Sequence, residues 1–355
     1  MRKVDESDVR SGSPLEIDSL GMWALTAGLP EQIERALGNT RTTSGLPHGD
    51  GITSVAVLGM GGSGIAGDVL AAAGAHASRV PIVAVKSYEL PAWVTKSTLV
   101  FAVSCSGDTE ETLEATGEAI TRGAPLVAIT SGGRLAAMAG DHDALIVDVP
   151  PPLSAPRAAI GSLSVPPLVI AERLGLLEGV IDALEGSIAG LQARRDRLVQ
   201  PLSLSEELAE RIGRTIPLFH GAQGLSSVAA SRWKTQVNEN AKAPAVWSAQ
   251  PELSHNEIAG WAQNGDVTRQ ILTVLDLRTD DEHPQVKRRF RWVGEMLEEV
   301  VADVISVWAE GSSAIARFFD LVLVGDFLSL HLARKEGIDP GPVPILGELK
   351  GHLAG

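Results

Sequence analysis

The sequence predicts an α/β protein with two domains, each a mainly parallel, doubly wound sheet flanked by helices. Short apolar runs of strand length alternate with helix-length segments in both halves of the chain. A proline cluster and a long helical stretch separate the two halves. The length of 355 residues is enough for two hydrophobic cores of ordinary size.

The first half contains five apolar, mostly β-branched runs that predict the strands of one sheet. These runs are residues 54–60, 80–85, 99–104, 126–130 and 144–149. Helices are expected between some of them, at 65–77 and 110–122. Regular structure is expected to stop at the proline cluster, which consists of Pro150, Pro151, Pro152 and Pro156.

The second half repeats the alternation of strand and helix after a helical stretch from 165 to about 214. The expected strands are 216–220, 243–247, 270–277 and 304–308, and the expected helices are 225–240, 284–301 and 313–335. This pattern predicts a first domain over residues 1–164, connecting helices over 165–210 and a second domain over 211–355. Ligand sites in such sheets lie beyond the carboxyl ends of the strands.

Composition and charge exclude several classes of function. A net charge of −14 and a pI of about 5.0 argue against binding to nucleic acid or to an anionic membrane. The most apolar segment, 315–332, is interrupted by charged residues, and the N-terminus is charged, so neither a membrane span nor a secretory signal is expected. The single cysteine, Cys105, excludes an intrachain disulfide and indicates a cytoplasmic protein.

A glycine-rich loop, Gly-Met-Gly-Gly-Ser-Gly at 59–64, follows the first expected strand and opens a helix. Its spacing fits a phosphate-binding turn at a helix N-terminus, and a tight structural turn explains it equally well. A dinucleotide site also needs an acidic residue at the end of the second strand. That strand ends Val85-Lys86-Ser87, and no acid occurs before Glu89, so dinucleotide binding is disfavoured.

A second loop favours a phosphate ligand, because Ser104, Ser106 and Thr109 fall where the third strand turns into a helix. Hydroxyls and free backbone amides at a helix N-terminus form a neutral cradle for a phosphate group. The spacing of Asp108 and Glu111 also resembles a capping box, which would make the loop a helix start only. A cap needs one such residue, so three hydroxyls beside a second glycine loop favour a phosphomonoester.

These two loops resemble the phosphosugar-binding signature of the sugar isomerase (SIS) domain superfamily. The resemblance rests on Gly61, Gly62 and Ser63 together with the Ser-x-Ser-Gly-x-Thr segment at 104–109. It implies that the phosphate is bound by Gly61, Gly62, Ser63, Ser104, Ser106 and Thr109. Asp108 stands where that signature commonly has asparagine, so its side chain is expected to point away from the phosphate.

Further segments resemble the bifunctional phosphoglucose/phosphomannose isomerase family across essentially the whole chain and in the same order. They are an Asn-Glu-Asn segment at 238–240, a His-Asn-Glu segment at 255–257, Pro-Arg at 156–157, the N-terminal 18–22, and 339–343 leading to Lys350. The resemblance implies two SIS domains and interconversion of an aldose 6-phosphate with fructose 6-phosphate through a cis-enediol.

The family match implies a role for each of four residues. Glu239 is the base that moves a proton between carbon-2 and carbon-1, and Arg157 stabilises the enediolate. His255 assists ring opening and reaches the site of a neighbouring subunit, which implies a homodimer, and Lys350 also assists ring opening. Without the match, Glu239 and Arg157 would be interpreted as surface residues and Lys350 as a lysine of the C-terminal tail. His255 would be interpreted as a surface or core residue. No metal and no cofactor are needed, and the histidines show no paired metal-ligand spacing.

Gly341 departs from the family, which often has threonine between the two prolines of this segment. Because the segment helps to accommodate both epimers at carbon-2, the expected substrate is glucose 6-phosphate before mannose 6-phosphate. The alternative function is a regulatory protein that binds a sugar phosphate without turnover. The joint presence of Glu239, His255, Arg157 and Lys350 favours the enzyme.

Overall fold

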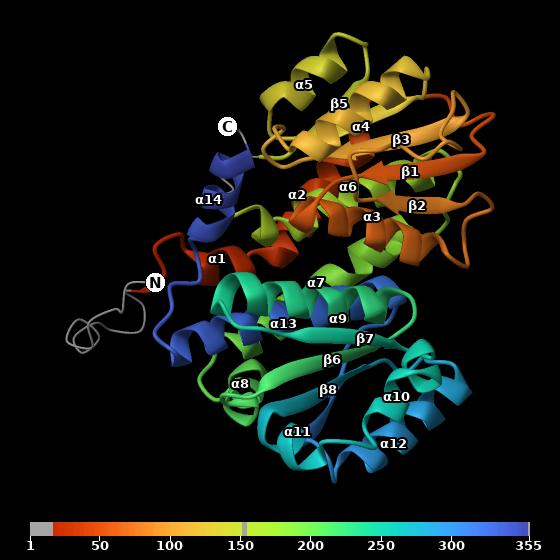
Figure 1. The fold of residues 1–355 in the computed structure, drawn as a ribbon. Helices are drawn as coiled ribbons and strands as arrows, with labels where there is room; N and C mark the ends of the chain where they lie inside the picture. Colours follow the sequence, from red (N-terminus) through yellow and green to blue (C-terminus); the bar gives the residue numbers. More distant parts are fainter. Residues whose placement is uncertain (1–16, 151–154, 354–355) are drawn as a thin grey trace.

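The computed structural model describes residues 17–150 and 155–353. The expected absence of a secretory signal concerns residues 1–16, which lie outside the described residues, and so do Pro151 and Pro152 of the proline cluster. Two parallel sheets form the described structure, one in each half of the chain (Figure 1). The predicted α/β class with two sheets flanked by helices is confirmed.

The first sheet has five parallel strands in the order β2-β1-β3-β4-β5. Its strands are β1 (Ser54–Leu58), β2 (Ile82–Val85), β3 (Thr98–Val103), β4 (Leu126–Thr130) and β5 (Leu145–Asp148). The central strands β1, β3 and β4 are buried throughout, because helices cover both faces of the sheet. All five strands match the predicted runs to within two residues at each end.

The helices of this half are α1 (Met22–Ala27), α2 (Leu29–Thr42), α3 (Gly61–Gly74), α4 (Glu110–Thr121) and α5 (Gly133–Gly140). Helix α3 begins four residues before the predicted start at 65, because the glycine loop itself forms the first helical turn. Gly61 has a φ of +51°, which glycine adopts without strain. The glycine loop is therefore the N-terminus of α3 and directly follows β1.

The second sheet has four parallel strands in the order β7-β6-β8-β9. Its strands are β6 (Ile216–Ala222), β7 (Val246–Gln250), β8 (Leu272–Arg278) and β9 (Asp303–Trp308). Side chains alternate between its two faces, so Phe219 and Leu275 join the main core while Leu218 and Val274 join a separate cluster. That separate cluster packs under α12 (Pro284–Leu297).

The remaining helices of the second half include α9 (Leu225–Gln236), which continues as a π-helical turn η3 (Val237–Ala241). This turn accounts for the start of β7 three residues later than predicted. Sequence analysis missed three short elements between β7 and β8, namely η4 (Glu252–His255), α10 (Glu257–Gly260) and α11 (Gly265–Ile271). They are too short to show an amphipathic period.

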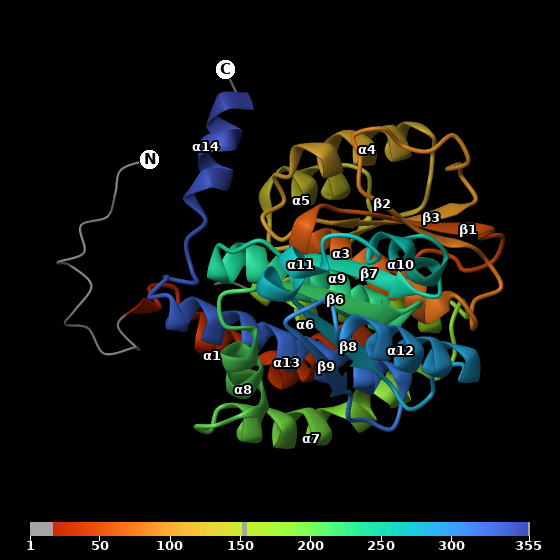
Figure 2. The same ribbon diagram turned by 60° about the horizontal axis from the view of Figure 1, so that its bottom comes forward.

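The connecting stretch forms α6 (Ile160–Arg173), α7 (Val180–Leu198) and α8 (Leu204–Ile212), as its composition predicts. The longest helix, α13 (Ala314–Lys335), is buried along almost its whole length and packs against α7, α8 and α9 between the two sheets (Figure 1). None of the described helices is long and apolar enough to cross a membrane. Helix α14 (Pro344–Leu353) has no buried residue and stands beside the two sheets (Figure 2).

Helices α9 and α13 approach closely at one glycine. Trp233 of α9 is fully buried, and its Nε1 donates a hydrogen bond to the Leu321 carbonyl oxygen of α13 at 2.8 Å. A Cβ atom on Gly325 would lie 2.1 Å from Trp233 Nε1, so only glycine fits there. This contact fixes α13 against the helix that ends in the Asn-Glu-Asn segment.

Candidate active site

The two loops that the sequence assigns to a phosphate lie side by side, because β1 and β3 are neighbours in the sheet. Ser63 Oγ accepts a hydrogen bond from the Cys105 backbone amide at 3.2 Å, which joins the loops directly. Ser104 Oγ lies 2.9 Å from Thr109 Oγ1 and accepts from the Gly107 amide at 3.1 Å. Ser63 and Ser104 are buried, so their hydroxyls hold the two loops in shape.

Gly61, Ser106 and Asp108 are the exposed members of the two loops, and Thr109 is half-buried. Gly107 has a φ of +74°, and a Cβ there would lie 1.8 Å from the Gly132 carbonyl oxygen. Any other residue at this position would displace the turn. The loop therefore needs glycine between its hydroxyl-bearing residues, and it leaves one hydroxyl, that of Ser106, at the surface.

Asp108 does not cap helix α4, so the capping-box interpretation is wrong. The N-cap of α4 is Thr109, and it makes no side-chain capping bond. Asp108 Oδ1 instead accepts hydrogen bonds from the backbone amide and from Nε of Arg134 at the start of α5, at 3.1 and 3.3 Å. Its carboxylate is thus directed to a neighbouring helix.

Arg157 occupies the centre of the candidate site. It is 7% exposed, and it lies on the short helix η2 (Pro156–Ala158) that leads into α6. Its Nε donates to Asn240 Oδ1 at 2.6 Å, and its Nη1 lies 3.7 Å from Glu239 Oε2. Burial lowers the pKa of its guanidinium and the charge of Glu239 opposes that shift. The surface interpretation of Arg157 is therefore excluded.

The guanidinium also binds the segment before α14, because Nη2 donates to the carbonyl oxygens of Pro340 and Gly341 at 2.5 and 2.6 Å. On its other side, Arg157 touches the first phosphate loop. A Cβ on Gly62 would lie 3.1 Å from Arg157 Cα. The backbone of Arg157 thus lies against the phosphate loop, while its side chain joins the Asn-Glu-Asn segment to the C-terminal segment.

A buried polar network holds Arg157 in place. Arg232 forms a two-pronged ion pair with Asp326 at 2.9 and 2.6 Å, and its Nη2 donates to the Arg157 carbonyl oxygen at 2.8 Å. Asn240 Nδ2 donates to Ser329 Oγ at 2.8 Å. Arg232, Asn240, Asp326 and Ser329 are all buried. Such satisfied networks fix geometry, since each lost partner leaves a buried polar group unpaired.

Glu239 lies in the π-helical turn, and its side chain is 28% exposed. Single π-turns occur frequently at functional sites. Lys242 follows in the left-handed conformation with a φ of +55°, and its Nζ donates to the Glu239 carbonyl oxygen at 2.5 Å. Burial and the charge of Arg157 lower the pKa of Lys242. Sequence analysis did not single out this second cation, because its position depends on a backbone turn without a sequence signal.

His255 and Lys350 are not brought to Glu239 within this single chain. Both are exposed, His255 at the end of η4 and Lys350 in α14. In the described residues neither makes a hydrogen bond or ion pair with Glu239 or Arg157. The segment before α14 does pass the site, since Arg157 binds Gly341 nine residues before Lys350.

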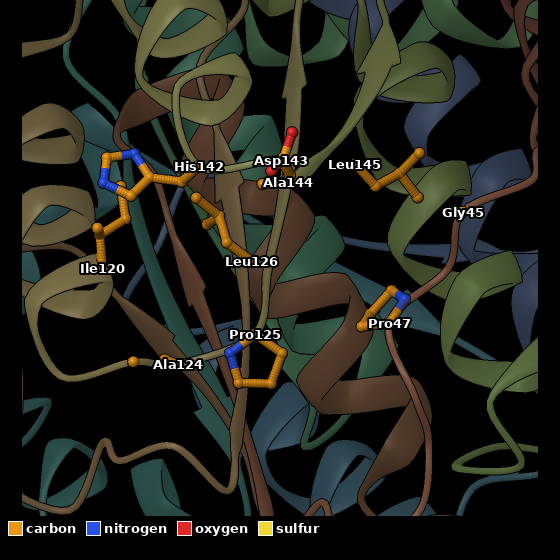
Figure 3. Close-up of a pocket in the computed structure, with 11 residues that line it drawn as sticks. Gly45, Pro47, Ile120, Ala124, Pro125, Leu126, His142, Asp143, Ala144 and Leu145 are labelled. Carbon is orange, nitrogen blue, oxygen red and sulfur yellow. The ribbon is translucent and has the colours of Figure 1, made fainter.

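A separate cavity of about 340 Å³ lies elsewhere in the first half (Figure 3). It is lined by residues that precede β4 and β5, including Pro125 and His142, and by Gly45 and Pro47. The strands are parallel, so this cavity is at their amino ends while the phosphate loops follow their carboxyl ends. Among the described residues, no three His, Cys, Asp or Glu side chains gather as metal ligands would.

Comparison with known proteins agrees with this geometry. Residues 52–164 match the SIS domain, and residues 203–353 match the bacterial phospho-glucose isomerase C-terminal SIS domain. The chain is 34% identical over 337 residues to a bifunctional phosphoglucose/phosphomannose isomerase of Caldicellulosiruptor bescii, covering 94% of this chain and 99% of that protein. A protein of the same description from Aquifex aeolicus is 36% identical over 300 residues, covering 84% and 90%.

Solved structures show the same fold at low sequence identity. The C-terminal domain of glucosamine-fructose-6-phosphate aminotransferase from Francisella tularensis superposes with a TM-score of 0.69 at 16% identity, covering 93% of this chain and all of that domain. Tagatose-6-phosphate ketose/aldose isomerase from Escherichia coli gives 0.66 at 16%, covering 94% and 98%. With the identities above 30% over most of its length, the chain belongs to the bifunctional phosphoglucose/phosphomannose isomerase family.

Proposed function

We propose that the protein interconverts glucose 6-phosphate, and also mannose 6-phosphate, with fructose 6-phosphate. The observation that carries the proposal is Arg157, which contacts the phosphate loop at Gly62 and lies 3.7 Å from Glu239. A sugar phosphate held by the loops would thus extend toward a carboxylate and a buried guanidinium. Two relatives that match most of the length of this chain, at 34% and 36% identity, are described by the same activity.

In the proposed mechanism, the Glu239 carboxylate takes the proton from carbon-2 of the open aldose and returns it to carbon-1. The carbonyl oxygen at carbon-1 gains a proton and the hydroxyl at carbon-2 loses one, so the cis-enediol converts to the ketose without net change in protons. Negative charge develops on these oxygens, and the fixed guanidinium of Arg157 stabilises it. The carboxylate is partly shielded from water, which suits a general base.

The phosphate is proposed to bind at Gly61, Gly62, Ser63, Ser104, Ser106 and Thr109. The backbone amides at the start of α3 and the exposed Ser106 hydroxyl supply neutral donors. An acidic protein can hold an anion in this way without a cluster of basic side chains. The proposal requires no metal and no cofactor, because Glu239, Arg157 and His255 account for the movement of protons and charge.

Ring opening is assigned to His255, assisted by Lys350. Both are exposed in the single chain, which is consistent with the proposed homodimer in which His255 completes the site of the partner subunit. The proposal also keeps a cytoplasmic location and the division into a first domain (1–164), connecting helices (165–210) and a second domain (211–355). The first domain match ends at residue 164, as this division has it, while the second begins at 203, within the proposed connecting helices.

A coupled assay that follows formation of glucose 6-phosphate from fructose 6-phosphate tests the proposal. Wild-type protein is expected to turn over in the presence of a chelator, and Glu239→Gln is expected to lose at least about a thousandfold in kcat, since the base is removed. Glu295→Gln, which changes an exposed carboxylate of α12, is the matched control. Full activity of Glu239→Gln contradicts the assignment of the base.

The alternative, a regulatory sugar-phosphate-binding protein, makes a different prediction. It requires that fructose 6-phosphate raise the melting temperature while no product forms at any enzyme concentration. The arrangement of Arg157 beside Glu239 favours the enzyme, since binding a phosphate needs only the loops. Mannose 6-phosphate as a separate substrate arm tests whether both epimers are accepted.

A further inference from the structure

A buried histidine in the second domain links the sheet to the segment that carries His255. His220 lies on the central strand β6 and is fully buried. Its Nδ1 lies 3.1 Å from Asp276 Oδ1 on the neighbouring strand β8. Its Nε2 lies 3.5 Å from Glu257 Oε1 on α10. Both ring nitrogens therefore face a carboxylate.

The sheet register places this cluster on one face. His220 pairs with Ser248 of β7 and with Asp276 of β8 in the strand ladder. Leu218, two residues before His220, belongs to the cluster that includes Leu253 of η4 and not to the main core. The histidine thus points to the side of the sheet that η4 and α10 cover, where Glu257 meets it.

The imidazolium form fits between the two carboxylates. Burial acts to lower the pKa of His220, but the bonds with Asp276 and Glu257 outweigh it and raise the pKa to about 9. Burial likewise opposes ionisation of Glu257, yet its ion pair with His220 keeps the pKa of that carboxyl below its usual value. At neutral pH the pair is therefore ionised, with His220 positive between two negative groups.

Within the described residues, neither His220 Nε2 nor Glu257 Oε1 has a hydrogen-bond partner of good geometry. Each is buried, so the ion pair between them is what compensates both atoms. If either His220 or Glu257 is replaced by a neutral residue, the charge of the other stays buried without a counter-charge. The pair is consequently a strong attachment point for α10.

The segment 252–257 has few other attachments to the domain. Leu253 is its one buried residue, and α10 has none. Ser254 Oγ donates to Gln250 Oε1 at the end of β7 at 2.6 Å, and the half-buried Ile258 of α10 packs against the same cluster as Leu253. The other bond of the segment is local, from Asn256 Nδ2 to Glu252 Oε1 at 2.8 Å. His255 is exposed and lies only two residues before Glu257. The place of His255 therefore depends on Ser254 before it, which is bound to β7, and on Glu257 after it, which is bound to His220.

We propose that Glu257 and His220, with Asp276 behind them, are positioning residues that hold His255 where it can act on the sugar ring. The inference rests on the proposed function, in which His255 assists ring opening. A misplacement of about 1 Å in a catalytic group can cost about a hundredfold in rate, so a rigid attachment two residues away affects turnover.

Glu257→Gln in the full-length protein is the first test. The kcat for the isomerase reaction is expected to fall about ten- to hundredfold with KM changed less than about twofold, because the phosphate loops lie in the other half. Glu295→Gln on α12, an exposed carboxylate of the same domain, is expected to leave both values unchanged. An unchanged kcat in Glu257→Gln overturns the inference.

A combination with His255→Gln separates positioning from general damage. If Glu257 acts through His255, the double variant is no slower than His255→Gln alone. A further loss of similar size in that background overturns the inference. Full activity of His255→Gln itself contradicts the ring-opening role and so the proposed function at that residue.

Hydrogen exchange gives a readout that does not depend on activity. Backbone amides of residues 252–260 are expected to exchange faster in Glu257→Gln and in His220→Gln, and at the wild-type rate in Glu295→Gln and His255→Gln. Wild-type exchange in the folded Glu257→Gln protein overturns the attachment. Because Glu257 is partly exposed, its variant is expected to fold even where His220→Gln does not.

Discussion

Arg157 brings together residues that are far apart in the chain, since its partners Asn240 and Gly341 are 83 and 184 positions away. The side chain needs three separate N–H groups in a planar arrangement to reach Asn240, Glu239 and the carbonyl oxygens of the C-terminal segment. Lysine has one ammonium group and cannot satisfy these acceptors together. Arginine at position 157 is therefore required by these acceptors as well as by the proposed reaction.

Replacing Arg157 with lysine is expected to lower kcat about a hundredfold or more, because the fixed donors near the developing oxyanion are lost. The KM for the sugar phosphate is expected to change less, since the phosphate loops remain. Steady-state kinetics measure both values. A variant with wild-type kcat contradicts the oxyanion role.

Leu20 leaves no room for a side chain at position 341, because a Cβ on Gly341 would lie 2.7 Å from Leu20 Cγ. Gly341→Thr, which installs the residue common in the family, is expected to destabilise the protein by about 1–3 kcal/mol through overpacking. Leu20→Ala in the same chain is expected to restore part of the stability, because the Cβ that alanine keeps would still lie 2.9 Å from the new Cβ. Urea unfolding of the single and double variants measures this, and equal stability of Gly341→Thr and wild type contradicts it. The double variant then permits a clean comparison of the two epimers.

At the scale of single residues, Arg157 and Glu239 could be predicted only through the family resemblance. An arginine or a glutamate taken alone does not indicate a catalytic role. Lys242 and the partners of His220 were missed. Their positions arise from a left-handed residue and from the register between β6 and β8, neither of which a single sequence displays.

At the scale of elements, α1 is held against α13 by an aromatic contact between Trp23 and His331, with ring centroids 4.8 Å apart. Burial lowers the pKa of His331 to about 4. The ordinary value is 6.5. The unfolded chain therefore takes up a proton on this histidine as the pH falls below 6.5, whereas the folded chain does so only near 4. Stability is lost in that window.

His331→Leu is expected to remove this loss, which amounts to at most about 3 kcal/mol between pH 6.5 and 4. Urea unfolding of the variant and of wild type at several pH values in that range measures the difference. His76→Gln, a change at an exposed histidine after α3, is the control and is expected to follow wild type. Parallel pH dependence of His331→Leu and wild type contradicts the assignment.

Most of the long elements were predicted, but the 14-residue helix α2 was missed, as were the short helices. The parallel strands consist of short, mostly apolar runs, so the nine strands of the two described sheets were located from the sequence, including the partly exposed edge strands β2, β5 and β7. Elements such as α10 and α14 lack a buried face, and apolar periodicity carries no information about them. The starts of α3 and β7 were misplaced because glycine turns and a π-turn extend helices beyond their usual sequence limits.

At the scale of the whole molecule, the proposed dimer predicts complementation between two inactive variants. Glu239→Gln and His255→Gln each damage both sites of a homodimer. In a mixed dimer, one site receives the intact Glu239 of one subunit and the intact His255 of the other. Random reassociation of equal amounts is then expected to restore about a quarter of wild-type activity.

The measurement is the coupled assay after the two variants are mixed under conditions that exchange subunits, with each variant alone as control. Size-exclusion chromatography establishes the oligomeric state in the same samples. Failure to recover activity in a mixture that contains mixed dimers contradicts the contribution of His255 across the interface. It leaves the assignment of Glu239 as the base unchanged.

The contacts of Arg157 join parts of the chain that are far apart in sequence, so they determine when during folding the protein becomes active. The contacts with Asn240 and Gly341 form only after both halves have folded and the C-terminal segment has arrived, and contacts of such long sequence separation form late. In refolding from denaturant, the burial of Trp233 against α13 is expected to precede the return of catalysis. During synthesis, likewise, the guanidinium meets its last acceptors only after the chain has left the ribosome through Gly341.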